Sequence, residues 1–268
     1  VIHKEAFDRI AETINRIKKL VEGETPNIDE IIEFKRGDIR DLSFLEKVFS
    51  SKKKKNEKFE GVIHFCGLKS VNDSIKTPIE YWDVNVLGTI NLVKIMLRYG
   101  CFSLVFSSSA TVYGNPKENP IKEDAEINPT TTYGVTKCIT EKFLFDIHKQ
   151  FSNKLRIAIL RYFNPIGAHE SGLIGEWPLG KPNNIFPLLN LAGLGITESF
   201  QVFGNDWPTK DGTCVRDYIH VMDIASGHIC ALKYLLENEA QVICLNLGTG
   251  KGTTVLELIN TYQEINSV

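Results

Sequence analysis

The sequence predicts an α/β protein, a doubly wound parallel sheet followed by a smaller C-terminal lobe. Short β-rich runs alternate with amphipathic helical stretches between residues 31 and 162. Strands and helices that alternate in this way form βαβ units, whose right-handed crossovers produce a parallel sheet. Polar or small residues follow these strands, and ligands bind beyond the carboxyl ends of strands in such sheets. From about Gly167 glycine and proline punctuate the chain, which indicates an inserted lobe.

The first half of the chain contains alternating expected helices and strands. Helical spacing of apolar residues predicts a helix at 3–22. We then expect a strand at 31–34, a capped helix at 41–50, a strand at 61–67, a helix at 78–99, a strand at 101–107 and a helix at 131–150. Pro78 stands in the first turn of its helix, where a proline is tolerated.

The second half begins with one more strand of the main sheet, expected at 155–162. In the lobe we expect a helix at 185–194, a strand at 200–203 and a loop at 204–213. A helix at 221–236, a strand of the main sheet at 242–247 and a helix at 254–265 complete the chain. The strand ends then carry Asp38, the segment 65–67, the serines 107–109 and Asn164.

Composition is that of an ordinary globular protein. The 268 residues are 43% hydrophobic and carry a formal net charge of −2, so nothing attracts nucleic acid or an anionic membrane. The six cysteines form no C-x-x-C pair and several lie in apolar runs, which indicates buried thiols and a reducing cytoplasm. The six histidines show no metal-ligand spacing, and we expect no metal.

Tyr133 and Lys137 stand four residues apart at the start of an amphipathic stretch. On a helix this spacing places the phenol and the amine on one face, where the cation is expected to lower the pKa of the tyrosine. Such a pair suits proton transfer, and a hydroxyl from the serines 107–109 would complete a relay. A second match, Tyr113 and Lys117, has glycine and proline between the partners and is interpreted as a turn.

A dinucleotide-binding fold also needs a glycine-rich turn after its first strand, where backbone amides hold the pyrophosphate. No G-x-G-x-x-G or G-x-x-G-x-x-G occurs near the front of this chain. The glycines at 248, 250 and 252 join a strand to a helix, but their spacing is wrong for a phosphate loop. We interpret that segment as a turn.

Five segments resemble the UDP-glucose 4-epimerases, a family of the extended short-chain dehydrogenase/reductase group. They are 102–114 (FSLVFSSSATVYG), 64–69 (HFCGLK), 161–169 (RYFNPIGAH), 182–184 (PNN) and 202–220 (VFGNDWPTKDGTCVRDYIH). The resemblance covers essentially all of the chain. It implies a Rossmann-like fold and NAD-dependent interconversion of UDP-glucose and UDP-galactose through a 4-keto sugar. It also implies a homodimer that uses helices 78–99 and 131–150.

The resemblance assigns a role to each matching residue. Tyr133 would remove the 4-hydroxyl proton, Lys137 would hold the nicotinamide ribose, and Ser109 would bridge the 4-oxygen and the phenol. The implied NAD-binding residues are Asp38, Ile39, Phe65, Lys69, Asn85, Lys137 and Tyr162. The implied UDP-sugar residues are Ser109, Asn164, Asn183, Asn184, Ile185, Gln201, Val202, Phe203 and Arg216. Arginine suits a diphosphate because its guanidinium is planar and always charged.

The implied division is an NAD-binding domain at 1–166 and a lobe at 167–268 that mainly binds UDP-sugar, with 219–247 returning to the main sheet. Compared with the family, Thr132 stands where proline is common, Cys214 where glycine is usual and Trp177 where an acid is common. The first βαβ turn and the end of the lobe are missing. We therefore expect a fragment that lacks both ends and is inactive by itself.

Two other functions are compatible with parts of the pattern. A nucleotide-sugar 4,6-dehydratase shares the fold and the tyrosine–lysine pair, but it typically has Asp-Glu where this chain has Ala110 and Thr111. A non-catalytic NAD-binding protein of the same fold usually loses the tyrosine or the lysine, and both are present here. The residues favour the epimerase over each alternative.

Overall fold

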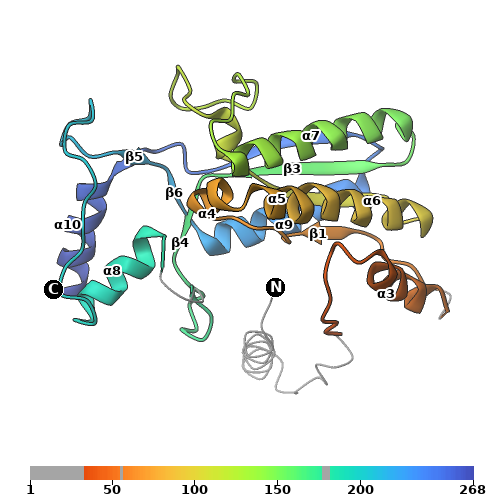
Figure 1. The fold of residues 1–268 in the computed structure, drawn as a ribbon, viewed down its shortest axis with the longest axis horizontal. Coiled ribbons are helices and arrows are strands. Elements are labelled where there is room, and N and C mark those ends of the chain that lie inside the picture. The colour runs from red at the N-terminus through yellow and green to blue at the C-terminus, as the bar shows by residue number, and fades with distance from the viewer. Residues whose placement is uncertain (1–32, 55–56, 177–181) are drawn as a thin grey trace.

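The computed structural model describes residues 33–54, 57–176 and 182–268 (Figure 1). The expected helix at 3–22 and residues 31–32 of the first expected strand lie outside the described residues. Glu33 and Phe34, the described end of that strand, are not in a strand. No helix in the described part of the chain is both long and apolar enough to cross a membrane.

The main sheet contains four parallel strands in the order β1-β2-β3-β7. They are β1 (Val62–His64), β2 (Ser103–Ser109), β3 (Arg156–Tyr162) and β7 (Val242–Leu247). Every residue of β2 is buried, as is typical of a parallel strand covered on both faces. The predicted parallel sheet is confirmed, and β7 pairs with β3 as the last expected strand of the sheet.

Helices cover both faces of this sheet, so the doubly wound prediction is confirmed. On one face Leu104 and Phe106 of β2 pack with α3 (Leu42–Lys54), α6 (Gly88–Arg98) and α7 (Thr132–Gln150). On the other face Val105 of β2 and Leu160 of β3 pack with α9 (Val221–Glu237). Side chains that alternate along a strand explain how β2 supplies both cores. In Figure 1, α5, α6 and α7 run along the strands, and α8 and α10 stand at the opposite end of the molecule from α3.

The expected helix at 78–99 is divided in the structure. It consists of α5 (Pro78–Tyr81), a π-helical segment (Trp82–Leu87) and α6, and it is preceded by a short helix that was not expected, α4 (Val71–Lys76). Ser70 caps α4 by accepting a hydrogen bond from the Asp73 amide at 3.3 Å. The π-helical segment contains Asn85, whose side chain bonds a distant loop. Helical spacing alone does not predict this local widening, and π-helical turns of this kind are often found at functional sites.

The expected strand at 200–203 is wrong. These residues are not in a strand; Phe200 is half-buried and the other three are exposed, Phe203 to 82%. Within the described residues no strand pairs with them, and an apolar alternation without a partner does not make a sheet. The short pairings of the lobe involve other segments: β4 (Asn164–Ile166) with β6 (Tyr218–His220), and β5 (Val215–Arg216) with β8 (Thr253–Thr254).

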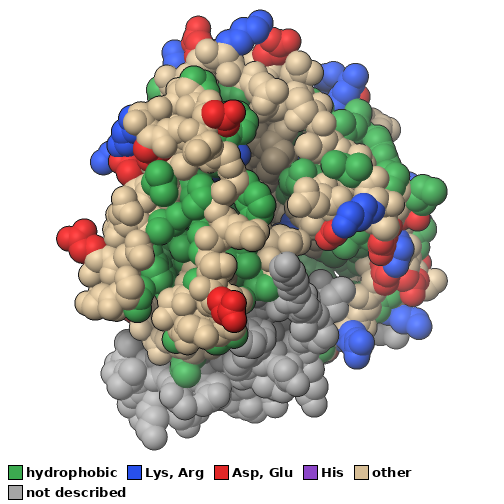
Figure 2. All heavy atoms as spheres, turned by 60° about the vertical axis from the view of Figure 1, so that its left-hand side comes forward, with side chains coloured by type: hydrophobic (Ala, Val, Ile, Leu, Met, Phe, Trp, Pro, Cys, Tyr) green, Lys and Arg blue, Asp and Glu red, His purple; other side chains and the backbone are tan. Residues whose placement is uncertain are grey.

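Two helices complete the lobe, α8 (Ile185–Gly193) and α10 (Val255–Asn266). Thr254 and Glu257 form a capping box at the start of α10, which fixes where this helix begins. The Tyr262 hydroxyl donates to Asn190 Oδ1 at 3.1 Å and joins the two helices. The side of the molecule that carries them shows hydrophobic side chains at its surface (Figure 2). Leu194 and Ile196, just after α8, and Ile265 of α10 are exposed.

Candidate active site

The start of α7 brings Tyr133 and Lys137 to the carboxyl end of β2. Thr131 caps the helix by accepting a hydrogen bond from the Gly134 amide at 3.1 Å. The Tyr133 amide donates to Ser74 Oγ of α4 at 3.2 Å, which fixes the first turn from outside. Lys137 Nζ lies 5.8 Å from the centre of the Tyr133 ring. The helix face predicted from the four-residue spacing is therefore present.

Lys137 is 5% exposed, and its amine is held by β2. Nζ donates to the carbonyl oxygen of Ser107 at 2.7 Å and lies 4.9 Å from the centre of the Phe106 ring. Burial lowers the pKa of Lys137 to about 8, while Cys66 and Glu141 act in the opposite direction. A buried amine with this pKa changes its charge close to physiological pH.

The pKa of Tyr133 differs from the sequence-based expectation. Burial raises it to about 12, and the Ser109 hydroxyl acts against that rise by hydrogen bonding. Lys137 is not among the causes because its amine points to the Ser107 carbonyl rather than to the phenol oxygen. Desolvation therefore raises the pKa of Tyr133, and the lowering expected from the Lys137 cation is not seen. Ser109 itself is 9% exposed, and its oxygen accepts from the Thr111 amide at 3.2 Å.

Asn85 anchors the loop that follows β1. Its Oδ1 accepts from the Leu68 amide at 2.8 Å, and its Nδ2 donates to the Leu68 carbonyl at 3.0 Å. Nδ2 also lies 3.2 Å from Thr136 Oγ1 on α7. A Cβ added at Gly67 would lie 3.1 Å from Asn85 Oδ1 and 3.7 Å from Lys137 Nζ. A side chain at this position would crowd Asn85, so the glycine lets the loop backbone lie against Asn85 and close to the buried amine.

Phe65 and Tyr162 meet at a histidine that was not predicted for the site, His228 of α9. The Phe65 ring centre lies 4.5 Å from that of His228, and the Tyr162 hydroxyl bonds His228 Nε2. His228 Nδ1 donates to the Ile224 carbonyl at 2.7 Å, so Nε2 accepts from the tyrosine. Burial raises the pKa of Tyr162. The histidine was missed because its helix is distant in sequence and no spacing links it to Tyr162.

The remaining cofactor candidates lie near the end of β1. Asp38 is ion-paired with Arg40 at 2.7 Å, and hydrogen bonds from Arg40 lower the pKa of Asp38 to about 2. Ile39 packs on Gly88, since a Cβ added at that glycine would lie 2.6 Å from Ile39 Cγ2. Lys69 is exposed and lies 3.7 Å from Glu176.

Only some of the residues predicted to bind the UDP-sugar are linked by hydrogen bonds or ion pairs to the residues described so far. Asn184 donates to Glu176 Oε1 at 2.5 Å, so Glu176 links it to Lys69. The Asn164 amide donates to the Asp217 carbonyl at 2.9 Å, which fixes the entry to the lobe. Arg216 is exposed and donates to the Val215 carbonyl at 2.7 Å. Among the described residues, no hydrogen bond or ion pair connects the following candidates to the Tyr133 group: Asn183, Ile185, Gln201, Val202, Phe203 and Arg216.

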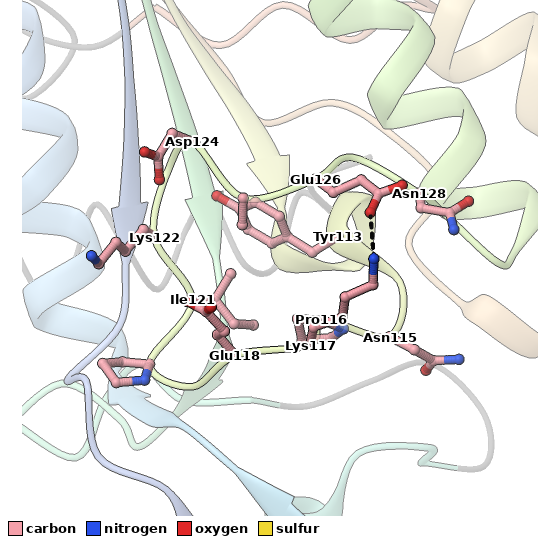
Figure 3. Close-up of a pocket in the computed structure, with 12 residues that line it drawn as sticks. Tyr113, Asn115, Pro116, Lys117, Glu118, Ile121, Lys122, Asp124, Glu126 and Asn128 are labelled. Carbon is pink, nitrogen blue, oxygen red and sulfur yellow. Dashed lines mark hydrogen bonds and ion pairs between the residues drawn. The ribbon is translucent and has the colours of Figure 1, made fainter.

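A separate hollow of about 260 Å³ lies in the loop after the competing Tyr113–Lys117 match (Figure 3). Lys117 pairs with Glu126 across it at 3.5 Å, and Gly114 has a positive φ of 63°. The backbone therefore turns between Tyr113 and Lys117, as predicted. None of the residues that line this hollow was predicted as a site residue.

Comparison with known proteins places the chain among sugar-nucleotide enzymes. The model of the NAD dependent epimerase/dehydratase family matches residues 4–244. UDP-glucose 4-epimerase 2 of Arabidopsis thaliana is 48% identical over 254 residues, which are 95% of this chain and 70% of that protein. The bifunctional UDP-glucose 4-epimerase and UDP-xylose 4-epimerase 3 of the same plant is 46% identical over 257 residues, with the same coverage of 95% and 70%.

Solved structures give the same result. The chain superposes on UDP-glucose-4-epimerase from Stenotrophomonas maltophila, which holds NAD and formylated UDP-arabinopyranose. The TM-score is 0.86 at 42% identity, covering 99% of this chain and 73% of that one. UDP-glucose 4-epimerase from Bifidobacterium longum, in complex with NAD+ and UDP, gives 0.83 at 38% identity, covering 98% and 80%.

Proposed function

The chain belongs to the NAD dependent epimerase/dehydratase family, and from that premise we propose how its residues interconvert UDP-glucose and UDP-galactose. The activity is that of an NAD-dependent UDP-glucose 4-epimerase, which acts at sugar C4 through a 4-keto sugar. The observation that carries the assignment of residues is the buried group of Tyr133, Lys137 and Ser109 at the end of β2. It combines a proton carrier, a cation and a hydroxyl at a strand end, where sheets of this kind bind their ligands.

Tyr133 is proposed as the acid–base group. Its phenolate form takes the proton from the sugar 4-hydroxyl, which makes it the neutral phenol, and the phenol gives that proton back after the sugar has presented its other face. Ser109 hydrogen-bonds the 4-oxygen and the phenol, so the proton moves over a short path. The Lys137 cation stabilises the phenolate, and its bond to the Ser107 carbonyl holds the amine at the same strand end.

NAD supplies the acceptor and donor for the hydride of C4. The residues around Lys137 fit this group, since Gly67 lets the loop backbone approach the buried amine closely and Phe65 offers a ring that is 59% exposed. Lys137 and Tyr162 are proposed to hold the nicotinamide half, and Phe65, Lys69 and Asn85 the middle of the dinucleotide. Asp38 and Ile39 are proposed for the adenine end.

The lobe is proposed to bind the UDP-sugar. Arg216 supplies a planar, positively charged guanidinium for the diphosphate. Phe203 supplies an exposed ring for contact with the nucleoside. Asparagine side chains can recognise hydroxyl and carbonyl groups because each has donors and an acceptor. The full set on the substrate side is Ser109, Asn164, Asn183, Asn184, Ile185, Gln201, Val202, Phe203 and Arg216.

The assembly is proposed to be a homodimer that pairs α5, α6 and α7 with the same helices of a second copy. Apolar side chains exposed on α5, on α7 and on the π-helical segment between α5 and α6 support this pairing: Ile79, Trp82, Leu87, Ile139 and Phe145. The proposed location is the cytoplasm, where the six free thiols would stay reduced.

The test is turnover of UDP-glucose and UDP-galactose by the purified protein, extended to the full length of its relatives and supplied with NAD. Tyr133→Phe should reduce the rate about 10²- to 10⁴-fold, the usual contribution of general acid–base catalysis. Tyr234→Phe is the matched control, because that phenol is exposed on α9. An unchanged rate in Tyr133→Phe would contradict the catalytic assignment. Release of a 4-keto-6-deoxy sugar would show the dehydratase chemistry instead.

A further inference from the structure

The helix face that presents Tyr133 and Lys137 carries a third ionisable group. Glu141 follows Lys137 by four residues, the same interval that separates Lys137 from Tyr133. Its side chain is 4% exposed. Carboxylates are almost never buried to this degree without a partner. The proton transfer described above does not use Glu141, so its burial needs another reason.

The partners of Glu141 come from the two central strands. Oε2 accepts from Arg161 Nη2 at 2.8 Å, and Oε1 accepts from Arg161 Nε at 3.1 Å and from Ser108 Oγ. The two bonds with Arg161 form a bidentate pair of high geometric specificity. The carboxylate thus fastens α7 to β2 and β3 at once.

Arg161 extends the network to the loop beyond β2. Its Nη1 donates to the Tyr113 hydroxyl at 2.7 Å and to the Glu123 carbonyl at 2.9 Å. Tyr113 is the aromatic residue in the centre of Figure 3, and its hydroxyl donates to Asn246 Oδ1 of β7 at 2.7 Å. The guanidinium therefore has protein partners on both sides and is fixed in position.

Glu141 bonds β2 at the same place where Lys137 and Tyr133 contact that strand. Ser108, which it bonds, stands between Ser107 and Ser109. The Ser107 carbonyl accepts from Lys137, and the Ser109 hydroxyl faces Tyr133. Across the sheet, Ser108 pairs in register with Arg161, and Ser109 pairs with Tyr162. A shift of α7 along β2 would break the Glu141 bonds and displace all of these contacts together.

Stability alone does not explain the buried pair. Removing two charges from water is costly, and well-packed apolar residues can often replace a buried ion pair without loss of stability. Apolar residues cannot, however, fix a helix on a strand by directional bonds or place a negative charge near an amine. Position and charge are what this pair adds.

The negative charge of Glu141 raises the pKa of Lys137. The groups that face the Lys137 amine are Tyr133 and Glu141 on α7, His64 on β1 and Cys66 after it. Burial raises the pKa of the Cys66 thiol, and burial together with Lys137 lowers the pKa of His64 to about 3, so both are neutral at pH 7. Within this group Glu141 supplies the negative charge that favours protonated Lys137.

We propose that Glu141 is a positioning residue for the proton-transfer group: paired with Arg161, it holds α7 on the ends of β2 and β3 and sets the geometry and charge around Lys137. Its effect on turnover rests on the proposed epimerase function. Its effect on Lys137 does not, and can be measured without substrate.

Three variants of the protein test this. Glu141→Gln keeps the shape and removes the charge. The double variant Glu141→Leu with Arg161→Met removes both charges and leaves neither ion unpaired. Asp146→Asn is the matched control, because Asp146 is an exposed carboxylate on the same helix. Each variant is compared with the unmodified protein for its thermal unfolding, its kcat and KM, and the titration of Lys137. The titration is followed by NMR of the lysine ε-carbons and assigned with Lys137→Arg.

Glu141→Gln should lower the titration midpoint of Lys137 by about half a pH unit or more and reduce kcat about tenfold, with KM little changed. The double variant should unfold at or above the temperature of the unmodified protein, yet keep the lowered midpoint and the low kcat. Asp146→Asn should match the unmodified protein in every measurement. If Glu141→Gln does not fold, the double variant gives the answer by itself.

Recovery of both kcat and the Lys137 midpoint in the double variant would overturn the proposal, because the pair would then serve stability alone. An unchanged Lys137 midpoint in both variants would overturn it as well. If the unmodified protein, extended to the full length of its relatives, shows no turnover, only the proposed epimerase function fails. The Lys137 titration then decides the role of Glu141 by itself.

Discussion

The Lys137 amine donates to the carbonyl oxygen of Ser107 at 2.7 Å, and so the cation of α7 is bound to the backbone of β2 rather than to Tyr133. The same bond holds a charge in a site that is almost closed to water. Lys137 therefore has a pKa of about 8, far below its usual value, because burial disfavours its charged form. Three consequences concern this amine and its neighbours, and a fourth concerns the lobe.

Turnover should fall on the alkaline side with a midpoint near pH 8, because Lys137 loses its proton there and no longer stabilises a phenolate at Tyr133. Lys137→Arg should remove this fall, since a guanidinium stays protonated up to about pH 12. The measurement is kcat between about pH 6 and 10. An identical alkaline fall in Lys137→Arg would assign the titration to another group.

Lys137→Met should abolish turnover and stabilise the fold at pH 7. The pKa of Lys137 is about 8 in the folded protein, against 10.5 for a lysine in water, so the native state carries the cost of a buried charge below pH 8. Removing that cost, less the lost bond to Ser107, should raise the free energy of unfolding by about 1–3 kcal/mol.

The same variant has a second signature in its pH dependence. Between pH 8 and 10.5 the unfolded state holds a proton that the native state has released, so the unmodified protein gains stability as pH rises. The advantage of Lys137→Met should therefore shrink toward pH 10.5. Urea unfolding at neutral and alkaline pH measures this, with the exposed Lys142→Met as control. A loss of stability at pH 7 would contradict the desolvation account.

Asn85→Ala should destabilise the protein by about 1–3 kcal/mol, because it leaves partly buried backbone groups of Leu68 without partners. It should also weaken NAD binding, since the loop it anchors holds Gly67 and Lys69. Asn238→Ala is the control, an exposed asparagine with one bond to the Tyr234 carbonyl. Urea unfolding and NAD titration should separate the two variants. Equal effects in both would show that the anchor has no special role.

Glu176→Gln should strengthen UDP binding. Glu176 bonds Asn184 and lies 3.7 Å from Lys69, so its carboxylate occupies donors that a diphosphate would also seek. The pair with Lys69 is exposed, and the gain should be about two- to fivefold. Calorimetric titration with UDP measures the change in affinity. Glu170→Gln is the control, because Glu170 is an exposed glutamate shortly before Glu176 in the chain. Weaker binding would mean that Glu176 supports the site instead of competing for it.

Much of the site could be predicted because its parts are local in sequence. Tyr133 and Lys137 share a helix face whenever 132–150 is helical, and this follows from spacing alone. The serines 107–109 reach the same end of the sheet because parallel strands end together. The turn at Gly114 could likewise be predicted from the sequence, since glycine and proline exclude a helix there.

The errors concern properties that depend on distant residues. The expected strand at 200–203 fails because a strand needs a partner, which local alternation cannot guarantee. The π-helical segment at Asn85 depends on a loop seventeen residues away. His228 enters the site from α9, and no local pattern connects it with Tyr162.

By itself the sequence determined the parallel sheet, the order of its strands along the chain and the helix face that carries Tyr133 and Lys137. Only the tertiary structure decided which way the Lys137 amine points, that Glu141 pairs with Arg161, and that the pKa of Tyr133 rises rather than falls. The physical reason is that periodicity is a property of neighbouring residues, whereas desolvation and buried ion pairs depend on every group that surrounds a side chain.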